Sequence, residues 1–425
     1  MRMCLVTACV MTLGIGAAQA ASLTTLLSFT NTKGADPGAD PQAGLIMDSS
    51  GDLFGTTIGG GATGVGTVFE LTKGASSYTF SSLVAFNKTN GRDPFGGLLL
   101  DSSGNLYGTT ASGGSPSFDG NVFKLTKSGS SYSLSTLATF TGTNGSSPVS
   151  GLIADSAGNL YGTASTGAAS GYGTAFELVK NASNVSTLVT FNGSIGGDSA
   201  AGLIADSHGN LFGTTSTGGS GGNGTVFELV KGASSYTLST LASFNNATGQ
   251  TYAGLIMDST GDLFGTTYSG GSGGVGTVFE LAKGASGYTL NTLASFNTAD
   301  GADPDAGLIE DGNGDLFGTT LYGGSAGDGT AFELTNGVSG YALSTLVSFN
   351  GTNGANPYDG LIADSSGDLF GTDSAGGTGN NGTVFEITNS GFEVTSATAV
   401  PEPPSWALLA GGMLAVAASR RRRAG

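Results

Sequence analysis

A unit of about fifty residues recurs seven times along this chain, and no other sequence feature limits the possible folds so strongly. The unit opens with Gly-Leu, continues through a short turn that contains Asp, and closes on a run such as Val-Phe-Glu-Leu. Its copies begin at Gly44, Gly97, Gly151, Gly202, Gly254, Gly307 and Gly360, with spacings of 53, 54, 51, 52, 53 and 53 residues. Self-similarity at a period of about 20–50 residues indicates a solenoid, a propeller or another array.

Each copy contains four short runs of strand-forming residues. In the copy at Gly254 the runs are Gly254–Asp258, Leu263–Thr267, Thr277–Leu281 and Tyr288–Phe296. Glycine-containing turns or loops separate the runs, which are rich in the residues that strands favour. Because no segment shows a sustained helical periodicity, the unit is predicted to be four antiparallel strands.

Seven such units predict an all-β fold, a seven-bladed β-propeller with four antiparallel strands per blade. The runs lack a clean alternation of apolar and polar residues, which fits a blade whose two faces are both buried against neighbours. A β-solenoid is the alternative architecture. Its coils are usually shorter than the 53 residues that are typical here, and they do not need a four-strand unit.

The two ends of the array predict how the ring closes. The fourth-strand signature ends at seven phenylalanines: Phe29, Phe86, Phe140, Phe191, Phe244, Phe296 and Phe349. The first of them precedes the first Gly-Leu unit, and the last unit stops after Ile387 without a fourth strand of its own. We therefore expect Ser22–Phe29 to complete the last blade, which leaves no open sheet edge.

The composition indicates a folded, acidic body. The chain holds 77 glycines and only 11% charged residues, but Leu, Phe, Val and Ile recur at fixed offsets and can form a core. The net charge is −17, although basic residues lie at the ends, as Arg2 and Arg420–Arg423. A body this acidic should repel nucleic acid, so no nucleic-acid partner is expected.

Residues 1–20 have the pattern of a secretory signal peptide. Arg2 precedes an apolar stretch, and Ala18-Gln19-Ala20 offers a small-x-small site, so we expect signal peptidase to cleave after Ala20. A lipoprotein signal at Cys9 is the alternative, but too little apolar sequence precedes it. Both cysteines lie in the first ten residues, so the mature chain has no thiol for a disulfide or a metal site.

Residues 400–425 carry a second targeting pattern. Val400-Pro401-Glu402-Pro403 is followed by an apolar stretch of 13 residues, Trp406–Ala418, and then by Arg420–Arg423. A full helical span needs about 20 residues, so this anchor is marginal, and the arginines would stay cytoplasmic. An ordinary tail anchor is the alternative to a sorting signal.

This end of the chain resembles the PEP-CTERM sorting signal of Gram-negative bacteria, although Pro404 stands where Ser or Thr is more usual. The resemblance implies transient insertion in the inner membrane, processing by an exosortase-type transpeptidase, and release to or display on the cell surface. Residues 391–399 are then a linker between this signal and the propeller.

The repeat itself resembles the GloVer-type tandem repeat of secreted and surface-anchored bacterial proteins. The resemblance rests on Gly-Leu-Ile-x-Asp-x-x-Gly-Asn/Asp-Leu-Phe/Tyr-Gly-Thr, on the Gly-Gly loop and on Gly-Thr-Val/Ala-Phe-Glu-Leu. It covers about Ser22–Thr388, within an expected propeller domain of residues 21–390. It implies an architecture and a location, and it brings no catalytic residues.

Acidic side chains recur at two positions of the unit. The turn between the first two runs holds Asp48/Asp52, Asp101/Asn105, Asp155/Asn159, Asp206/Asn210, Asp258/Asp262, Asp311/Asp315 and Asp364/Asp368. Two side chains per turn are too few for the six to eight oxygens of a Ca²⁺ site, so capping of the turn by Asp is favoured and Ca²⁺ stays the alternative. No cofactor and no metal ligand are assigned.

The third run carries Glu70, Glu177, Glu228, Glu280, Glu333 and Glu386, with Lys124 in the second copy. We expect these glutamates to make structural hydrogen bonds to a neighbouring blade. A ring of acids around a cation path is the alternative. His208 is the only histidine and replaces a small residue in a turn, so a Ser-His-Asp triad has no plausible base, and no catalytic residue is assigned.

The connections that differ between copies are the most informative for function. They lead into the first run or join the second and third runs, and a four-stranded meander places both sets on one face. Loops on a rigid scaffold are where binding is usually found. The expected ligand face is marked by Tyr252, Tyr268, Tyr322 and Tyr358, with acids such as Asp303, Asp305 and Asp359 nearby in sequence.

These observations favour an exported, surface-sorted and non-enzymatic propeller that binds or structures the extracellular polysaccharide matrix of a Gram-negative bacterium. An enzyme that acts on polysaccharide, a lyase or a glycosidase, is the second hypothesis. A purely structural matrix protein without a ligand is the third.

Overall fold

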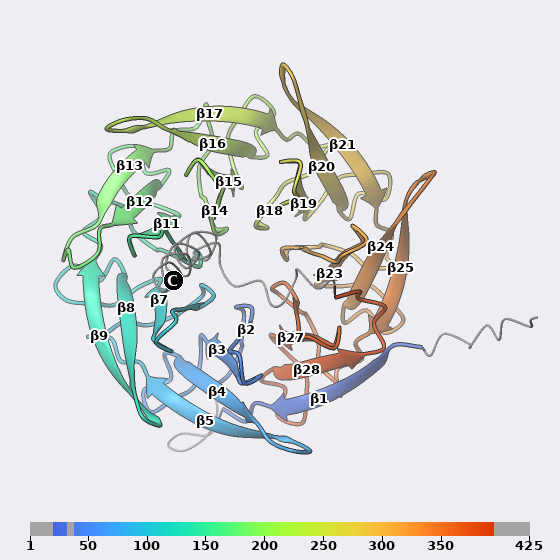
Figure 1. Cartoon of the computed structure of the whole chain (residues 1–425), viewed down its shortest axis with the longest axis horizontal. Coiled ribbons are helices and arrows are strands. Elements are labelled where there is room, and N and C mark those ends of the chain that lie inside the picture. The colour runs from blue at the N-terminus through green and yellow to red at the C-terminus, as the bar shows by residue number, and fades with distance from the viewer. Residues whose placement is uncertain (1–19, 32–37, 395–425) are drawn as a thin grey trace, which may run out of the picture.

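Seven four-stranded antiparallel sheets form a ring in the computed structural model (Figure 1), which describes residues 20–31 and 38–394. The predicted seven-bladed β-propeller is confirmed. Within the described ranges there is no helix long and apolar enough to cross a membrane. Ala18 of the expected cleavage site and the sorting motif Val400–Pro403 lie outside the described residues.

The blades follow one another along the chain. Blade 1 contains β2 (Ile46–Met47), β3 (Leu53–Thr57), β4 (Thr67–Lys73) and β5 (Tyr78–Ala85). Blade 2 contains β6 (Leu99–Leu100), β7 (Leu106–Thr110), β8 (Asn121–Ser128) and β9 (Ser131–Thr139). Blade 3 contains β10 (Ile153–Ala154), β11 (Leu160–Ala164), β12 (Thr174–Leu178) and β13 (Ser186–Thr190). Blade 4 contains β14 (Ile204–Ala205), β15 (Leu211–Thr215), β16 (Thr225–Lys231) and β17 (Tyr236–Ser243).

The remaining blades keep the same order. Blade 5 contains β18 (Ile256–Met257), β19 (Leu263–Thr267), β20 (Thr277–Gly284) and β21 (Gly287–Ser295). Blade 6 contains β22 (Ile309–Glu310), β23 (Leu316–Thr320), β24 (Thr330–Gly337) and β25 (Gly340–Ser348). Blade 7 contains β26 (Ile362–Ala363), β27 (Leu369–Asp373), β28 (Thr383–Thr388) and β1 (Ser22–Ser28). The first strand of each blade faces the centre and the fourth forms the rim (Figure 1).

The first strand is shorter than the sequence predicted. In blade 5 the expected run Gly254–Asp258 contributes only Ile256–Met257 to the sheet. The preceding glycines lie at the centre of the ring, where blades converge: a Cβ added to Gly151 would lie 3.4 Å from the carbonyl oxygen of Gly97. The backbone of these glycines packs closely against neighbouring blades and does not pair within the sheet.

Paired phenylalanines hold neighbouring blades together. The Phe that ends each fourth strand packs on the third-strand Phe of the next blade, as Phe296 does on Phe332 with 4.9 Å between ring centroids. All seven interfaces have this pair, including Phe29 with Phe69. The glycine of Leu-Phe-Gly-Thr makes room for it, since a Cβ on Gly265 would lie 2.7 Å from the ring of Phe279.

The ring closes as the ends of the repeat array predicted. β1 pairs antiparallel with β28, from Ser22 opposite Thr388 to Ser28 opposite Thr383. Thr372 of blade 7 donates a hydrogen bond of 3.0 Å to the carbonyl of Ala43 in blade 1. Equivalent threonines bind the next blade elsewhere in the ring, as Thr266 does to Ala306 at 2.9 Å. The seam therefore repeats the contacts of the other interfaces.

The first residues of the expected linker belong to the folded unit. The ring of Phe392 packs against Phe317 of blade 6, with 5.1 Å between centroids. The amide of Glu393 donates to the Asp311 carboxylate at 3.0 Å. Residues 391–394 therefore extend the propeller domain beyond residue 390, and the rest of the linker, 395–399, lies outside the described residues.

Candidate functional site

The two sets of variable connections meet on one face of the disc, as the meander predicted. Isolated β-bridges join them within a blade, between Ala302 and Tyr322 in blade 6 and between Ala355 and Ala375 in blade 7. On this face the centre of the ring is hollowed into a cavity of about 440 Å³. The cavity lies where loops from all blades converge, which is a common location for ligands.

The wall of this cavity, which we call the central pocket, comes from one position of the repeat. Each blade contributes the residue two places before its Gly-Leu: Gln42, Phe95, Val149, Ala200, Tyr252, Asp305 and Tyr358. Phe95, Val149 and Ala200 of blades 2 to 4 make one side apolar. Blades 5 to 7 and blade 1 make the other side polar, with two phenols, a carboxyl and an amide.

Asp305 is a carboxyl of the pocket wall with a strongly shifted pKa. Its Oδ1 atom is buried without a hydrogen-bond partner in the described part of the chain, and the Tyr358 hydroxyl lies close to its carboxylate. Burial raises the pKa of Asp305 to about 7, an effect that the Tyr358 hydroxyl opposes and the nearby Asp359 reinforces. The carboxyl can therefore donate or accept a proton near neutral pH.

Asp359 has a structural role beside it. One carboxylate oxygen accepts the Gly44 amide of blade 1 at 2.6 Å, and the other accepts the Gly360 amide at 2.6 Å. Burial raises its pKa despite these two hydrogen bonds. Because one oxygen binds backbone across the seam to blade 1 and the other binds backbone of blade 7, Asp359 fixes the ring rather than offering a free ligand group.

The four tyrosines of the expected ligand face come together on blades 5 to 7. Tyr252 and Tyr358 line the central pocket, and Tyr268 meets Tyr252 edge-on with 5.8 Å between ring centroids. Burial, with Asp303 next, raises the pKa of Tyr268, which also lies within electrostatic range of Tyr322. Tyr322 is 48% exposed and Tyr358 is 39% exposed, so both rings are open to solvent.

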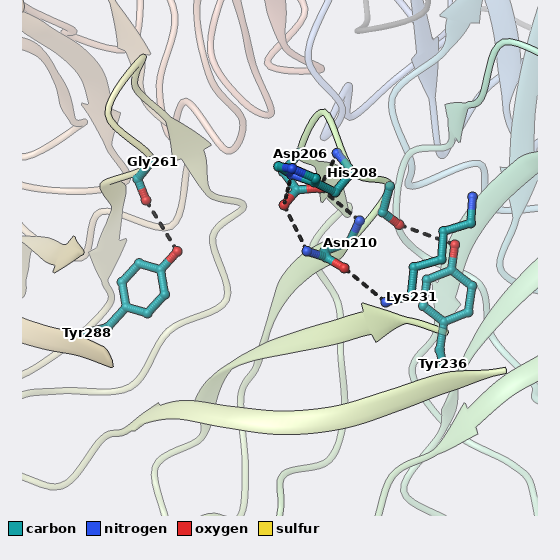
Figure 2. Close-up of polar contacts among 8 residues, drawn as sticks. Asp206, His208, Asn210, Lys231, Tyr236, Gly261 and Tyr288 are labelled. Carbon is teal, nitrogen blue, oxygen red and sulfur yellow. Dashed lines mark hydrogen bonds and ion pairs between the residues drawn. The ribbon is translucent and has the colours of Figure 1, made fainter. Parts of the chain in front are cut away.

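The acidic turns lie on the opposite face and are capped as the sequence predicted. In Figure 2 the Asp206 Oδ1 atom accepts the amides of His208 and Asn210, both at 2.9 Å, and Asn210 accepts the Lys231 amide, also at 2.9 Å. The other six turns repeat the pattern, as Asp258 does with the Asp262 amide at 2.8 Å. Residues 20–31 and 38–394 contain no group of three or more His, Cys, Asp or Glu that could hold a metal ion.

The expectation for the third-strand glutamates needs correction. Glu280 accepts a hydrogen bond of 3.0 Å from Asn291, and Glu177 accepts one of 3.0 Å from Tyr161, and both partners lie in the same blade as the glutamate. Glu280 lies directly opposite Asn291 in the ladder between β20 and β21, so the nearest polar side chain is in its own sheet. His208 is 83% exposed and within 3.6 Å of Asp206, in the solvent-exposed turn position expected for it.

Comparison with known proteins identifies the repeat. The sequence matches the family described as the Gloeobacter/Verrucomicrobia repeat over residues 15–155, 99–289 and 237–402. This chain belongs to that family. The matches together span nearly the whole chain, so the resemblance based on the Gly-Leu and Phe-Glu-Leu motifs is confirmed. No curated protein matches the sequence significantly.

Several solved structures resemble this Gloeobacter/Verrucomicrobia repeat protein in fold. The WD40 β-propeller domain of Doa1 is 11% identical with a TM-score of 0.52, over 85% of this chain and 96% of that one. A candidate 6-phosphogluconolactonase from Bacteroides uniformis is 15% identical with a TM-score of 0.50, over 77% and 88%. At such identities the likeness shows the fold alone.

A longer protein is matched as well. The extracellular domain of a candidate one-component system from B. thetaiotaomicron is 11% identical, with a TM-score of 0.49. The match covers 86% of this chain but only 40% of that one, so the repeat protein spans less than half the length of that relative.

The sequence predicted that the four tyrosines lie on one face, but it did not reveal the central pocket. Gln42, Phe95 and Val149 were not singled out, and Asp305 was one of many loop acids. The signal that could have found them is positional: all stand two places before the repeated Gly-Leu, the position that the ring gathers around its centre.

Proposed function

We propose that this protein is an exported, non-enzymatic binding protein of the extracellular polysaccharide matrix, with the central pocket and its surrounding tyrosines as the ligand face. The observation that carries the proposal is the gathering of Tyr252, Tyr268 and Tyr358 around the carboxyl of Asp305. Aromatic faces and hydrogen-bonding groups together suit the apolar and hydroxyl faces of a sugar ring. The pocket is open on one side, so it suits one sugar residue of a longer chain.

The chain ends support the location. Residues 1–20 have the pattern of a signal peptide and residues 400–425 that of a PEP-CTERM signal, so export, exosortase-type processing and surface display in a Gram-negative bacterium belong to this proposal. A body of low charged content and net charge −17 suits a soluble surface protein that does not adsorb to nucleic acid.

The tyrosines provide the test of binding. We expect a variant with both Tyr252→Ala and Tyr358→Ala to bind the exopolysaccharide of the producing cells at least about tenfold more weakly, because aromatic anchors dominate binding energy. Tyr172→Ala is the matched control, since this tyrosine lies on the same face in blade 3 and is 43% exposed. Equal retention of the double variant and the wild type in a co-sedimentation assay would remove the proposal.

A polysaccharide-acting enzyme is the second candidate, and Asp305 is the observation that favours it. A carboxyl with a pKa near 7 beside a phenol is suited to general acid–base chemistry. The binding proposal expects no new reducing ends and no unsaturated products when the protein is incubated with acidic or neutral polysaccharides. Products that form with the wild type and disappear with Asp305→Asn would establish the enzyme instead.

A further inference from the structure

A second cavity, of about 450 Å³, lies between blades 2 and 3. The turns that line it, which contain Asp101 and Asp155, lie on the face of the disc opposite the central pocket. Its lining includes Tyr107 and Lys124 from blade 2 and Leu160, Leu178 and Lys180 from blade 3. Comparison with the other interfaces of the same ring explains why a space exists here.

A tyrosine at the start of the fourth strand fills this place in five blades. These residues are Tyr78, Tyr132, Tyr236, Tyr288 and Tyr341. Each packs against the preceding blade, as Tyr78 does on Phe370 and Tyr132 on Phe54, with 6.4 Å between ring centroids in both pairs. Figure 2 shows Tyr236 and Tyr288, whose hydroxyls donate to the turn carbonyls of Gly209 and Gly261 at 3.3 Å.

Blade 7 lacks this tyrosine, and the chain supplies a substitute. Phe392 places its ring on Phe317 of blade 6, and the Ser390 hydroxyl donates to the turn carbonyl of Gly367 at 2.7 Å. A ring and a hydroxyl from the segment after β28 thus take over the two roles of the missing phenol. The interface between blades accepts an aromatic group that is not part of the fourth strand.

Blade 3 lacks the tyrosine as well, because its chain is shorter. The repeat from Gly151 to Gly202 has 51 residues rather than the usual 53, and the missing residues fall between β12 and β13. Lys180 is followed by Asn181–Asn184, where blade 4 has Gly232–Thr237 after Lys231. Val185 then resumes the pattern, so no aromatic side chain enters the space beside Tyr107.

The charge of the interface changes at the same place. A glutamate on the third strand of the preceding blade faces each tyrosine, as Glu228 of blade 4 faces Tyr288 of blade 5. Blade 2 alone has a lysine, Lys124, in place of this glutamate. The Lys124 ammonium lies 5.1 Å from the centroid of the Tyr107 ring. Within residues 20–31 and 38–394, neither Lys124 nor Lys180 takes part in an ion pair.

The carboxylates that also line the cavity are already engaged. The two oxygens of Asp101 accept the Asn105 amide at 2.9 Å and the Tyr107 hydroxyl at 3.1 Å, among other donors. The Oδ2 atom of Asp155 accepts the Asn159 side chain at 2.9 Å. These carboxylates are therefore not free to pair with Lys124. The lost tyrosine leaves a space of the size of an aromatic ring, and the gained lysine places a cation beside it.

We propose that the cavity between blades 2 and 3 binds a small aromatic carboxylate, whose ring takes the place of the absent tyrosine and whose anionic group meets Lys124. The ring packs on Tyr107, Leu160 and Leu178, as Tyr236 packs on the corresponding residues of blades 3 and 4. The carboxylate offsets the charge of Lys124, which stands where the six other copies have a glutamate. This site is independent of the polysaccharide proposal.

Calorimetric titration of the full chain with 4-hydroxyphenylacetate tests the proposal, with tyramine and 4-methylphenol as the cationic and neutral forms of the same ring. We expect one site per chain for the carboxylate, and at least about tenfold weaker binding of the other two probes. Lys124→Glu, which introduces the residue found in the six other copies, should weaken carboxylate binding at least about tenfold. Lys231→Gln, at the blade 4 position equivalent to Lys180, is the matched control and should bind as the wild type does.

A second variant tests the space itself. Replacing Asn181–Asn184 with the six residues Gly232–Thr237 of blade 4 restores the tyrosine, and it should abolish binding while raising the melting temperature. The proposal is overturned if millimolar 4-hydroxyphenylacetate does not bind the wild type, or if tyramine binds equally well. Circular dichroism establishes that both variants are folded. The proposal is also overturned if either the folded Lys124→Glu variant or the folded restored variant binds with unchanged affinity.

Discussion

Removal of Ser22–Phe29 is expected to lower the melting temperature by about 10 °C or more, the largest effect of any change considered for this protein. The segment supplies the whole outer strand of blade 7 and the Phe29 ring, which has no solvent exposure and packs on Phe69 of blade 1. Truncation of one buried phenylalanine alone costs about 3–5 kcal/mol, and the deletion also exposes the edge of β28. Differential scanning calorimetry of the deleted and intact chains measures the loss.

Two further samples separate ring closure from a general loss of packing. Phe29→Ala keeps the strand and should lose only part of the stability. A synthetic peptide of residues 22–29, added to the deleted chain, should restore much of the melting temperature, whereas the same peptide with Phe29→Ala should restore less. A deleted chain that melts within about 2 °C of the intact one would show that β1 does not close the ring.

This closure could be predicted because it depends on counting. Seven phenylalanine signatures, one of them before the first Gly-Leu unit, leave a three-stranded last blade, and an antiparallel blade can be completed only by that first strand. Strand order and the face of each loop follow from the meander in the same way. These features depend on the pattern of strands and turns, which recurs in all seven copies.

The sites could not be predicted to the same depth, because they arise where copies differ. Asp305 and Tyr358 are 53 residues apart, and they meet only because the ring brings the same repeat position of successive blades to its centre. The cavity between blades 2 and 3 depends on two residues that are missing, and a shorter repeat does not by itself tell whether a neighbour fills the space. Between blades 6 and 7, Phe392 fills the equivalent space. No pattern in the last residues of the propeller indicated this.

Asp373 illustrates a difference between copies that affects stability rather than binding. The six other copies have Thr or Ala at this position. In four of them the threonine hydroxyl is hydrogen-bonded to a threonine on the third strand, as Thr320 is to Thr330 at 2.9 Å. Asp373 has no solvent exposure, accepts a hydrogen bond of 2.6 Å from Thr383 through Oδ2, and has no partner for Oδ1 in the described part of the chain. Burial raises its pKa well above 3.8, against the effect of the Thr383 hydrogen bond.

We therefore expect Asp373→Thr to stabilise the protein by about 1–3 kcal/mol at pH 8, because a buried and incompletely paired carboxyl is replaced by the Thr–Thr hydroxyl pair of the other blades. The sign with pH follows from the raised pKa. The folded chain holds the Asp373 proton more tightly than the unfolded chain, so the destabilisation grows as pH rises from about 4 towards the folded pKa. The gain from the substitution should accordingly be large at pH 8 and smaller at pH 5.

Urea unfolding of the wild type and the variant at both pH values measures the difference in the free energy of unfolding. The comparison requires that the two proteins have equal m-values, the slopes of this free energy against urea concentration. Thr320→Asp in blade 6 is the matched control, since it places a carboxyl in the same environment and should destabilise the chain more at pH 8 than at pH 5. A gain from Asp373→Thr that is equal at both pH values would mean that packing, not ionisation, separates the two residues. A loss of stability at pH 8 would mean that the carboxylate makes a contact in blade 7 that threonine cannot replace, contrary to this prediction.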